Sequence, residues 1–214
     1  MSKAAPARRR EVGAVIVHFG PWTMTSRAVA SFRRHSPDTE ILIVNNEPSS
    51  QAPPDVGAPV LDAAGNFGYG AACNLGARVL KNELLVFANN DVEVLEGTIE
   101  RLRAALATGQ RAAAVGPRFI DGRRRPQRSV RLAPTPWRIL CENFFLPRLF
   151  PFLPLFRGHH TAYLRQNQPR IAETLLGALF LIRRDAFEDV GGFDEAYFFY
   201  AEESDLFARI RGRG

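Results

Sequence analysis

The nine residues 84–92, LLVFANNDV, join an uninterrupted apolar run to an abrupt polar end. Residues 84–88 show no charge and no polar alternation, which is typical of a strand buried on both faces of a parallel sheet. Ligands of such sheets bind beyond the carboxyl ends of the strands. Asp91 follows the run, and Mg²⁺ is commonly held by one or two carboxylates together with substrate phosphates and water. The stretch therefore predicts a central strand that ends at a ligand site, with a purely structural Asp as the alternative.

Similar apolar runs, and the helical patterns between them, define the fold class. The runs lie at residues 12–19, 41–44, 59–61 and 112–115. Two stripes with the spacing of an amphipathic helix are formed by Met24, Ala28 and Phe32 and by Ile99, Leu102 and Leu106. Strands that alternate with helices predict an α/β fold with a Rossmann-like, mostly parallel sheet flanked by helices.

The composition is that of an ordinary globular chain with unusual basicity. With 214 residues, 46% of them hydrophobic and 23% charged, a single domain is the default. The net charge is +6, and all of the 28 basic residues except Lys3 and Lys81 are arginine. Arginine favours phosphorylated ligands, anionic lipid or nucleic acid, whereas a genome rich in arginine codons would produce the same excess. Because a recognition helix and an aromatic stacking motif are both missing, we expect no nucleic-acid partner.

The cysteines and the distribution of apolar residues indicate where in the cell the protein is located. Cys73 and Cys141 are isolated, without the spacing of a metal site, and predict reduced thiols. The basic start of the chain is not followed by the apolar run of a signal peptide, and no window of about 18 uncharged apolar residues exists. We therefore expect a cytoplasmic protein, with peripheral contact to the inner face of a membrane left open.

Two further polar loops follow predicted strands. Residues 45–50, NNEPSS, would either bond a base or ribose edge or simply form a turn. Residues 65–76, GNFGYGAACNLG, contain glycines that let the backbone approach a ligand, and a helix starting near Gly70 would aim its N-terminal amides at phosphate. Asn74 lies inside that helix although Asn is a mediocre helix former. Together with Asp91, these loops predict one site at the carboxyl edge of the sheet.

The segment 191–206, GGFDEAYFFYAEESDL, places three acids within four residues behind an aromatic run. Glu202, Glu203 and Asp205 repel one another, so the cluster is expected to bind a cation or to raise the pKa of one carboxylate enough to make a general base. A solvated helix start is the alternative, because acids favour helix N-termini.

Residues 134–157 are rich in aromatic residues and leucine, are broken by five prolines and contain Arg138, Arg148 and Arg157. The segment would either lie on anionic lipid or pack on the domain as a lid. The adjacent His159 and His160 would point in opposite directions in an extended segment, which disfavours a shared metal site.

Three stretches resemble family 2 glycosyltransferases, and among these the rhamnosyltransferase-like enzymes of bacterial polysaccharide and cell-wall assembly. They are GNFGYGAACNLG, LLVFANNDV and GALFLIRRDAFEDVGGFDEAYFFYAEESDL, and the resemblance runs from about Val12 to the last residue. It implies a GT-A fold and an inverting hexosyltransferase. The enzyme would move a sugar, first guess rhamnose, from a dTDP- or UDP-sugar to a glycan or lipid-linked acceptor.

The resemblance also implies roles for individual residues. Asp91 would bind a divalent metal, Mn²⁺ or Mg²⁺, that neutralises the leaving diphosphate. Glu202 and Glu203 fall on the family's Glu-Asp pair, whose second member is usually the base that takes the acceptor proton; which of the two acts here stays open. Asn45 stands where many members have an Asp that contacts the base. The other donor-side positions are Asn66, Gly68, Asn74, Asn90, Gly177 and Ala178.

Residues 1–10, which end in three arginines, are expected to be a disordered basic arm. On the resemblance, residues 11–214 are expected to be a single GT-A domain. That domain would comprise a nucleotide-binding half at 11–117, a proline- and aromatic-rich insertion at 118–170 and a short acceptor and catalytic half at 171–214. Family members usually continue with further strands and often a histidine near the metal, so the last part is expected to be truncated. A degenerate, non-catalytic module that binds nucleotide or a membrane partner is the alternative function.

Overall fold

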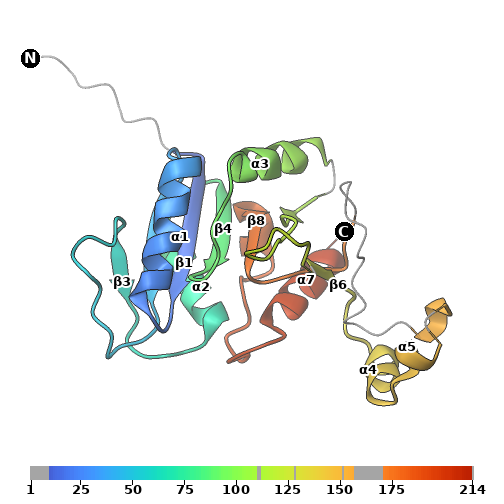
Figure 1. Ribbon diagram of the computed structural model, residues 1–214. Coiled ribbons are helices and arrows are strands. Elements are labelled where there is room, and N and C mark those ends of the chain that lie inside the picture. The colour runs from blue at the N-terminus through green and yellow to red at the C-terminus, as the bar shows by residue number, and fades with distance from the viewer. Residues whose placement is uncertain (1–9, 110–111, 128, 151, 157–170, 214) are drawn as a thin grey trace, which may run out of the picture.

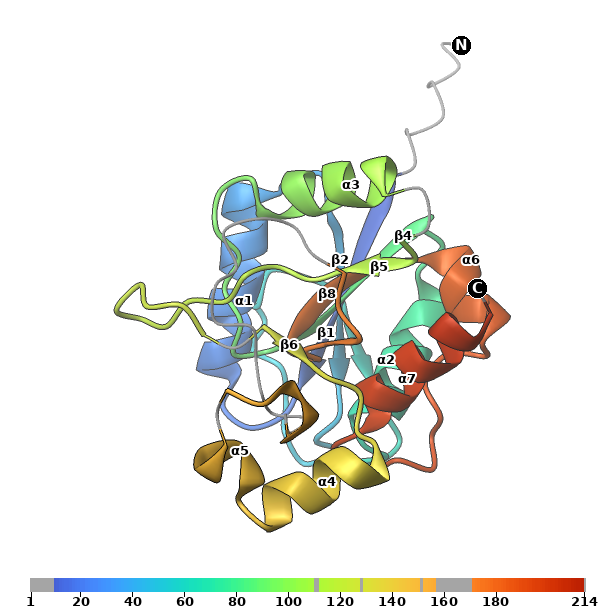
Figure 2. The same ribbon diagram turned by 90° about the vertical axis from the view of Figure 1, so that its right-hand side faces the viewer.

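The computed structural model describes residues 10–109, 112–127, 129–150, 152–156 and 171–213. Residues 1–9 of the basic arm expected at 1–10, and the histidine pair at 159–160, lie outside these ranges. Arg10 is described, and its guanidinium donates to the carbonyl of Thr39 over 3.3 Å. A six-stranded sheet forms the centre of the molecule, and helices cover both of its faces (Figure 1 and Figure 2).

Strands and helices alternate through the first half of the chain, except that β3 follows β2 without a helix between them. The strands are β1 (Val12–His18), β2 (Glu40–Asn45), β3 (Val60–Asp62), β4 (Leu84–Asn89), β5 (Ala114–Val115), β6 (Val130–Arg131), β7 (Thr174–Leu175) and β8 (Leu179–Arg183). The helices are α1 (Trp22–His35), α2 (Tyr69–Val79), α3 (Thr98–Thr108), α4 (Pro136–Asn143), α5 (Leu146–Leu149), α6 (Arg184–Asp189) and α7 (Glu202–Gly212), with a 3₁₀ turn at Pro154–Phe156.

The central sheet has the order β3-β2-β1-β4-β8-β5, and β6 and β7 form a separate antiparallel pair. β1 pairs parallel with β2 and β4, and β2 pairs parallel with β3. β8 runs antiparallel to both β4 and β5, so among the described strands of this sheet it alone is reversed. The expected mostly parallel α/β sheet is confirmed, and the carboxyl ends of β1 to β4 meet at one edge.

The core lies on both faces of the sheet because β1 and β4 are apolar on both sides. On one face Ile16 clusters with Phe32 of α1 and Leu106 of α3. On the other face Val15 clusters with Leu206 of α7 and with residues of α2. Each such large side chain contributes about 1.5–3 kcal/mol to the free energy of folding when it is fully buried. Packing on both faces therefore fixes the helices against the sheet.

Residues 175–182, LLGALFLI, form one apolar run in the sequence, and the structure divides this run into two parts. β7 ends at Leu175 and β8 begins at Leu179, so the residues between them form a turn. That turn leads into the only reversed strand of the central sheet, and it lies at the carboxyl end of β4 because the backbone N–H of Asn89 donates to the carbonyl of Ala178 over 2.9 Å.

We expect Gly76→Ala to reduce the free energy of unfolding by about 1–2 kcal/mol. A methyl carbon at this position of α2 would lie 2.8 Å from Cγ2 of Val15 and 3.1 Å from Cγ2 of Val44. These stiff, buried valines cannot rotate away, and the overpacking cost of about 1–3 kcal/mol exceeds the gain in helix propensity of about 1 kcal/mol. Denaturant titration measures the change.

Gly122→Ala is the matched control, because no heavy atom lies within 4 Å of a methyl carbon built there. It should change the free energy of unfolding by less than about 0.5 kcal/mol. If Gly76→Ala were as stable as the parent, the close contact of α2 with the sheet would not contribute to stability as described.

Candidate functional site

The end of β2 is organised by Asn45. Its buried amide donates to the carbonyl of Ser50 and to Oδ1 of Asp62, each over 2.8 Å, and its Oδ1 accepts from the backbone N–H of Glu47 over 3.1 Å. Asn45 therefore joins β2 to β3 and has its amide engaged within the protein. The exposed carboxylate of Asp62, which the sequence analysis did not single out, lies at the same edge.

Hydrogen bonds from Asn46 attach Asn66 and Gly68 to the end of β2. The Nδ2 of Asn46 donates to Oδ1 of Asn66 over 2.9 Å and to the carbonyl of Gly68 over 3.3 Å. The Asn66 oxygen also accepts from the backbone N–H of Gly68 over 3.1 Å. Buried Oδ1 of Asn46 has no hydrogen-bond partner among the described residues. The loop before α2 is thus held at the carboxyl edge, as the sequence predicted.

The aromatic run at residues 197–200 crosses this loop at Gly68. Gly68 has a φ of +91°, and a methyl carbon built on it would lie 2.9 Å from the carbonyl carbon of Phe198. A side chain at this position would meet backbone, which cannot move aside as a side-chain tip does. Glycine is therefore required for the aromatic run to lie against the loop.

Asn90 and Asp91 end β4 in different ways. The Nδ2 of Asn90 donates to the carbonyl of Phe19 over 2.9 Å and to Oγ1 of Thr25 over 3.2 Å, so Asn90 ties β4 to the end of β1 and to α1. Asp91 is exposed. The structure therefore leaves the carboxylate of Asp91, rather than the amide of Asn90, available to a ligand.

Gly177 and Ala178 lie between β4 and α7. Besides the Asn89–Ala178 hydrogen bond, the hydroxyl of Tyr69 donates to the carbonyl of Gly177 over 2.9 Å. A methyl carbon built on Gly177 would lie 3.6 Å from the carboxyl carbon of Glu203. The structure therefore brings both residues together with the end of β4 and with the acidic pair.

The acidic pair begins α7 and points into the protein. Tyr200 and Ala201, directly before it, both have left-handed φ angles of about 70°, which costs about 1–3 kcal/mol each for non-glycine residues. Glu202 and Glu203 are only 7% and 6% exposed. Strain of this kind persists where surrounding structure holds it, and it is frequent at functional sites.

The two glutamates have different surroundings. Burial raises the pKa of Glu202, with the negative charge of Glu203 adding to the shift and a backbone hydrogen bond and Arg131 opposing it. Its Oε2 has no hydrogen-bond partner among the described residues. Glu203 faces Arg131, whose Nη1 lies 3.7 Å from Oε1. Arg131 comes from β6, and the sequence analysis missed it because the basic run at 118–131 carried no signal of which arginine turns inward.

The third acid does not belong to the cluster, which corrects the expectation of three interacting carboxylates. Asp205 pairs with Arg209 one helical turn later, with the Nη2 of Arg209 2.6 Å from Oδ2 of Asp205. Arg209 also donates to the carbonyls of Val190 and Gly192. Asp205 therefore stabilises the attachment of α7 to the 190–192 turn, and the acidic site consists of Glu202 and Glu203.

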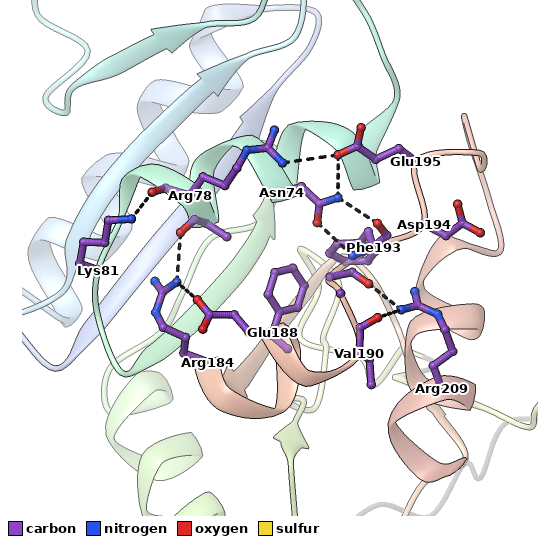
Figure 3. A pocket seen from close by; sticks show the side chains of 14 residues that line it. Asn74, Arg78, Lys81, Arg184, Glu188, Val190, Phe193, Asp194, Glu195 and Arg209 are labelled. Atoms are coloured by element: carbon purple, nitrogen blue, oxygen red, sulfur yellow. Dashed lines mark hydrogen bonds and ion pairs between the residues drawn. The ribbon is translucent and has the colours of Figure 1, made fainter. Parts of the chain in front are cut away.

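Asn74 is separated from this arrangement. Its Nδ2 donates to the carbonyl of Phe193 and to Oε1 of Glu195, and its Oδ1 accepts from the backbone N–H of Phe193, each over 2.9 Å (Figure 3). The side chain is buried, and its amide is occupied by these bonds. Asn74 thus fixes the turn that leads into the aromatic run, which explains a polar residue in the middle of α2.

Asn74 lies in the wall of an open pocket of about 910 Å³ along α2, α6 and residues 190–195 (Figure 3). Two of its arginines serve backbone carbonyls: Arg184 donates to Ala77 and Leu80 at the end of α2, and Arg209 to the 190–192 turn. Because its most buried cations are already engaged, we place the candidate site at the carboxyl edge of the sheet and not in this pocket.

Comparison with known proteins relates the chain to glycosyltransferases. The sequence profile of "Glycosyl transferase family 2" matches residues 14–191. An N-acetylglucosaminyl-diphospho-decaprenol L-rhamnosyltransferase of Mycobacterium tuberculosis is 33% identical over 170 residues, which cover 72% of this chain and 53% of that protein. The low-salt glycan biosynthesis hexosyltransferase Agl10 of Haloferax volcanii is 25% identical over 189 residues, covering 84% and 56%. The chain spans about half the length of these relatives.

Two solved structures share the fold. A mannosyltransferase from Pyrobaculum calidifontis, in complex with GDP-Man and Mn²⁺, has a TM-score of 0.60 at 14% identity and covers 95% of this chain and 52% of its own. TarS of S. aureus, residues 1–349, has a TM-score of 0.61 at 13% identity and covers 94% and 55%.

We expect Glu202→Gln to flatten the dependence of stability on pH. The folded-state pKa of Glu202 is raised above the ordinary value of 4.5, so its contribution to stability is complete below that value and is lost as the pH rises through the raised pKa. Gln does not ionise, so the variant should gain stability relative to the parent across this window. Chemical denaturation at a series of pH values measures the difference.

Glu96→Gln is the matched control because Glu96 is exposed before α3, and it should leave the pH profile as in the parent. A Glu202→Gln profile parallel to that of the parent would contradict a raised pKa at Glu202.

Proposed function

Because the chain belongs to glycosyl transferase family 2 and has the GT-A fold, we propose that it transfers a sugar from a nucleotide-diphosphate donor to a glycan acceptor. The relative from M. tuberculosis is named for rhamnose and for a diphospho-decaprenol acceptor. On that likeness we propose rhamnose, carried by dTDP or UDP, as the donor sugar and a lipid-linked glycan as the acceptor. Such an acceptor would require peripheral contact with a membrane.

One observation supports this proposal most: the buried pair Glu202 and Glu203 lies beside Gly177, at the same sheet edge where Asp91 follows the end of β4. A stable fold gains nothing from two carboxylates that are nearly excluded from water, since burying charge is costly. A reaction that must remove a proton from an acceptor hydroxyl requires such a group.

The residues at the edge suit a diphosphate-linked sugar. α2 starts at Tyr69, and its first turn contains no acidic residue, so its N-terminal amides are available to an anion. The loop of Asn66 and Gly68 fixes the backbone at that helix start. Asn45 would act on the base only indirectly, through Asp62 and the 46–50 turn, because its own amide is engaged.

A divalent metal fits the residues present at this edge. The described residues contain no group of three His, Cys, Asp or Glu side chains that would form a complete metal site, and Asp91 is a single exposed carboxylate. Mg²⁺ and Mn²⁺ take such sites when substrate phosphates and water supply the remaining ligands. A metal bound at Asp91 would supply positive charge for the leaving diphosphate.

We assign the general base to Glu203. It faces Gly177, which leaves space for an acceptor next to its carboxyl group, and Arg131 supplies an opposite charge. The acceptor hydroxyl would transfer its proton to the Glu203 carboxylate as its oxygen forms the new bond to the anomeric carbon. The bond to the diphosphate breaks on the opposite face, so the configuration inverts. Glu202 would keep the site negative and hold the start of α7.

Thermal unfolding with UDP, dTDP and GDP, each with and without Mn²⁺, tests the donor site. We expect one nucleotide to raise the melting temperature only with metal, because at about 100 times its Kd a ligand adds about 2.7 kcal/mol of stability. Asp91→Ala should abolish the metal-dependent part, whereas Glu96→Ala should retain it. If no nucleotide shifts the unfolding with or without metal, the proposed donor site is wrong.

Glu203→Gln should reduce sugar transfer by about 10²–10⁴-fold, the usual contribution of a general base, while the nucleotide-dependent shift in melting temperature is retained. The measurement is transfer of labelled sugar to a lipid-linked N-acetylglucosamine acceptor. A chain that binds nucleotide but transfers no sugar would indicate the alternative function, a non-catalytic nucleotide-binding module. If Glu203→Gln were as active as the parent, Glu203 would not be the general base.

A further inference from the structure

The segment that contains α4 and α5 exposes an unusual number of apolar side chains. Ten large apolar side chains between Trp137 and Leu155 are 43–94% exposed, which is half of all the large apolar side chains exposed in the described chain. Single exposed apolar residues are normal, but a contiguous group of this kind marks an interaction surface. These ten side chains are called the α4–α5 surface below.

The helix α4 turns its apolar stripe outward. Trp137, Leu140 and Phe144 follow one another at the three- and four-residue spacing of one helix face, and all three are exposed. Cys141, which lies next to Leu140 and one helical turn after Trp137, is fully buried. A helix that only covered the core would bury its large apolar side chains instead.

The α4–α5 surface is held in a defined shape. Thr135 caps α4, and Arg138 pairs with Glu173 at 2.5 Å and donates to the carbonyl of Ala133. The indole N–H of Trp137 donates to the carbonyl of Leu155 over 2.8 Å and so closes the segment on itself. The exposure therefore belongs to an ordered surface.

Charge identifies the partner. Residues 112–156 contain eight arginines and two acids in the sequence, a net charge of +6 that equals the net charge of the whole chain. The rest of the chain is therefore neutral overall. Six of the eight arginines lie at 118–131, directly before the α4–α5 surface in the chain, and residues 137–155 themselves contain Arg138 and Arg148 against Glu142. Arginine together with aromatic and leucine side chains is the composition that binds the interface of an anionic membrane. On the surface itself, Arg148 lies over the ring of Phe145.

The position of the surface suits this partner. Figure 1 and Figure 2 both place α4 and α5 at the end of the molecule where strands β1 to β4 end. The described residues include no helix that is long and apolar enough to cross a bilayer, so contact through α4 and α5 would be peripheral. A lipid-linked acceptor held in that membrane would lie on the same side as the candidate site.

We propose that the α4–α5 surface docks the protein on anionic membranes, with its aromatic and leucine side chains in the interface and its arginines at the lipid headgroups. The purpose of this docking, access to a lipid-linked acceptor, rests on the proposed function. The docking itself does not, because it is measured without donor, acceptor or metal.

Vesicle flotation of the full chain tests the proposal. Vesicles of phosphatidylcholine with phosphatidylglycerol should bind the protein, vesicles of phosphatidylcholine alone should bind it at least about tenfold less, and added salt should weaken the binding. Phe152→Ser with Leu155→Ser should reduce partitioning into the anionic vesicles by about tenfold or more, because two large apolar side chains no longer leave water. These residues are highly exposed, 94% and 66%, so the variant should melt as the parent does.

Val79→Ser with Leu95→Ser is the matched control. Both residues are exposed and apolar but lie outside the α4–α5 surface, so vesicle binding should be unchanged. Equal loss in the control, no binding of the parent to anionic vesicles, or equal binding to neutral vesicles would each overturn the proposal. A dimer in solution that the Phe152 and Leu155 variant dissociates, without vesicle binding, would make the surface an interface between two copies.

The outcomes separate the two proposals. Vesicle binding that the surface variant abolishes, in a chain that transfers no sugar, would leave the docking surface standing and remove the proposed function. Transfer to a soluble acceptor analogue without vesicle binding would support the proposed function and remove the docking surface.

Discussion

The parallel pairing of β1 with both β2 and β4 is the constraint on which the rest of the structure depends. Parallel strands end on the same side, so this pairing gathers polar residues from distant parts of the chain at one edge. His18, Asn45 and Asn89 stand at the ends of the three strands, in register with one another or one residue apart. β8, which runs the other way, then brings Gly177 and Ala178 to that edge from the second half of the chain.

The edge is polar, yet much of its polarity serves the fold. Asn45, Asn46 and Asn90 each connect neighbouring elements through their side-chain amides. Buried amides must be hydrogen-bonded. The bonds of these three side chains fix the loops that follow the strands. What is left for a ligand is different in kind: backbone amides at the start of α2, the carboxylate of Asp91 and the buried pair Glu202 and Glu203. A site built in this way suits an anionic donor and an acceptor that loses a proton.

The region between β5 and β7 contains both a contact with the acidic pair and the exposed apolar surface. At one end, Arg131 of β6 approaches Glu203. Farther along, Arg138 and Glu173 fix α4 with its apolar face outward. Because the same stretch of chain contacts the acidic pair and carries the proposed membrane surface, docking and the arrangement of the site are physically adjacent. The net positive charge of the chain arises largely from this stretch.

The sequence by itself determined the elements and their order. Runs such as 84–88 and stripes such as Ile99, Leu102 and Leu106 are local patterns, and burial on one or two faces translates them directly into strands and helices. It also placed Asp91 and the acidic pair at element ends, where the structure has them, whereas Gly177 lay inside an apolar run that the structure divides. Only the tertiary structure decided which polar residues are free: Asn74 and Asp205 are occupied by Phe193 and Arg209, while Arg131 turns toward Glu203. Hydrogen bonds and ion pairs between residues far apart in the chain produce no local pattern in the sequence. Their partners are therefore determined only by the tertiary structure.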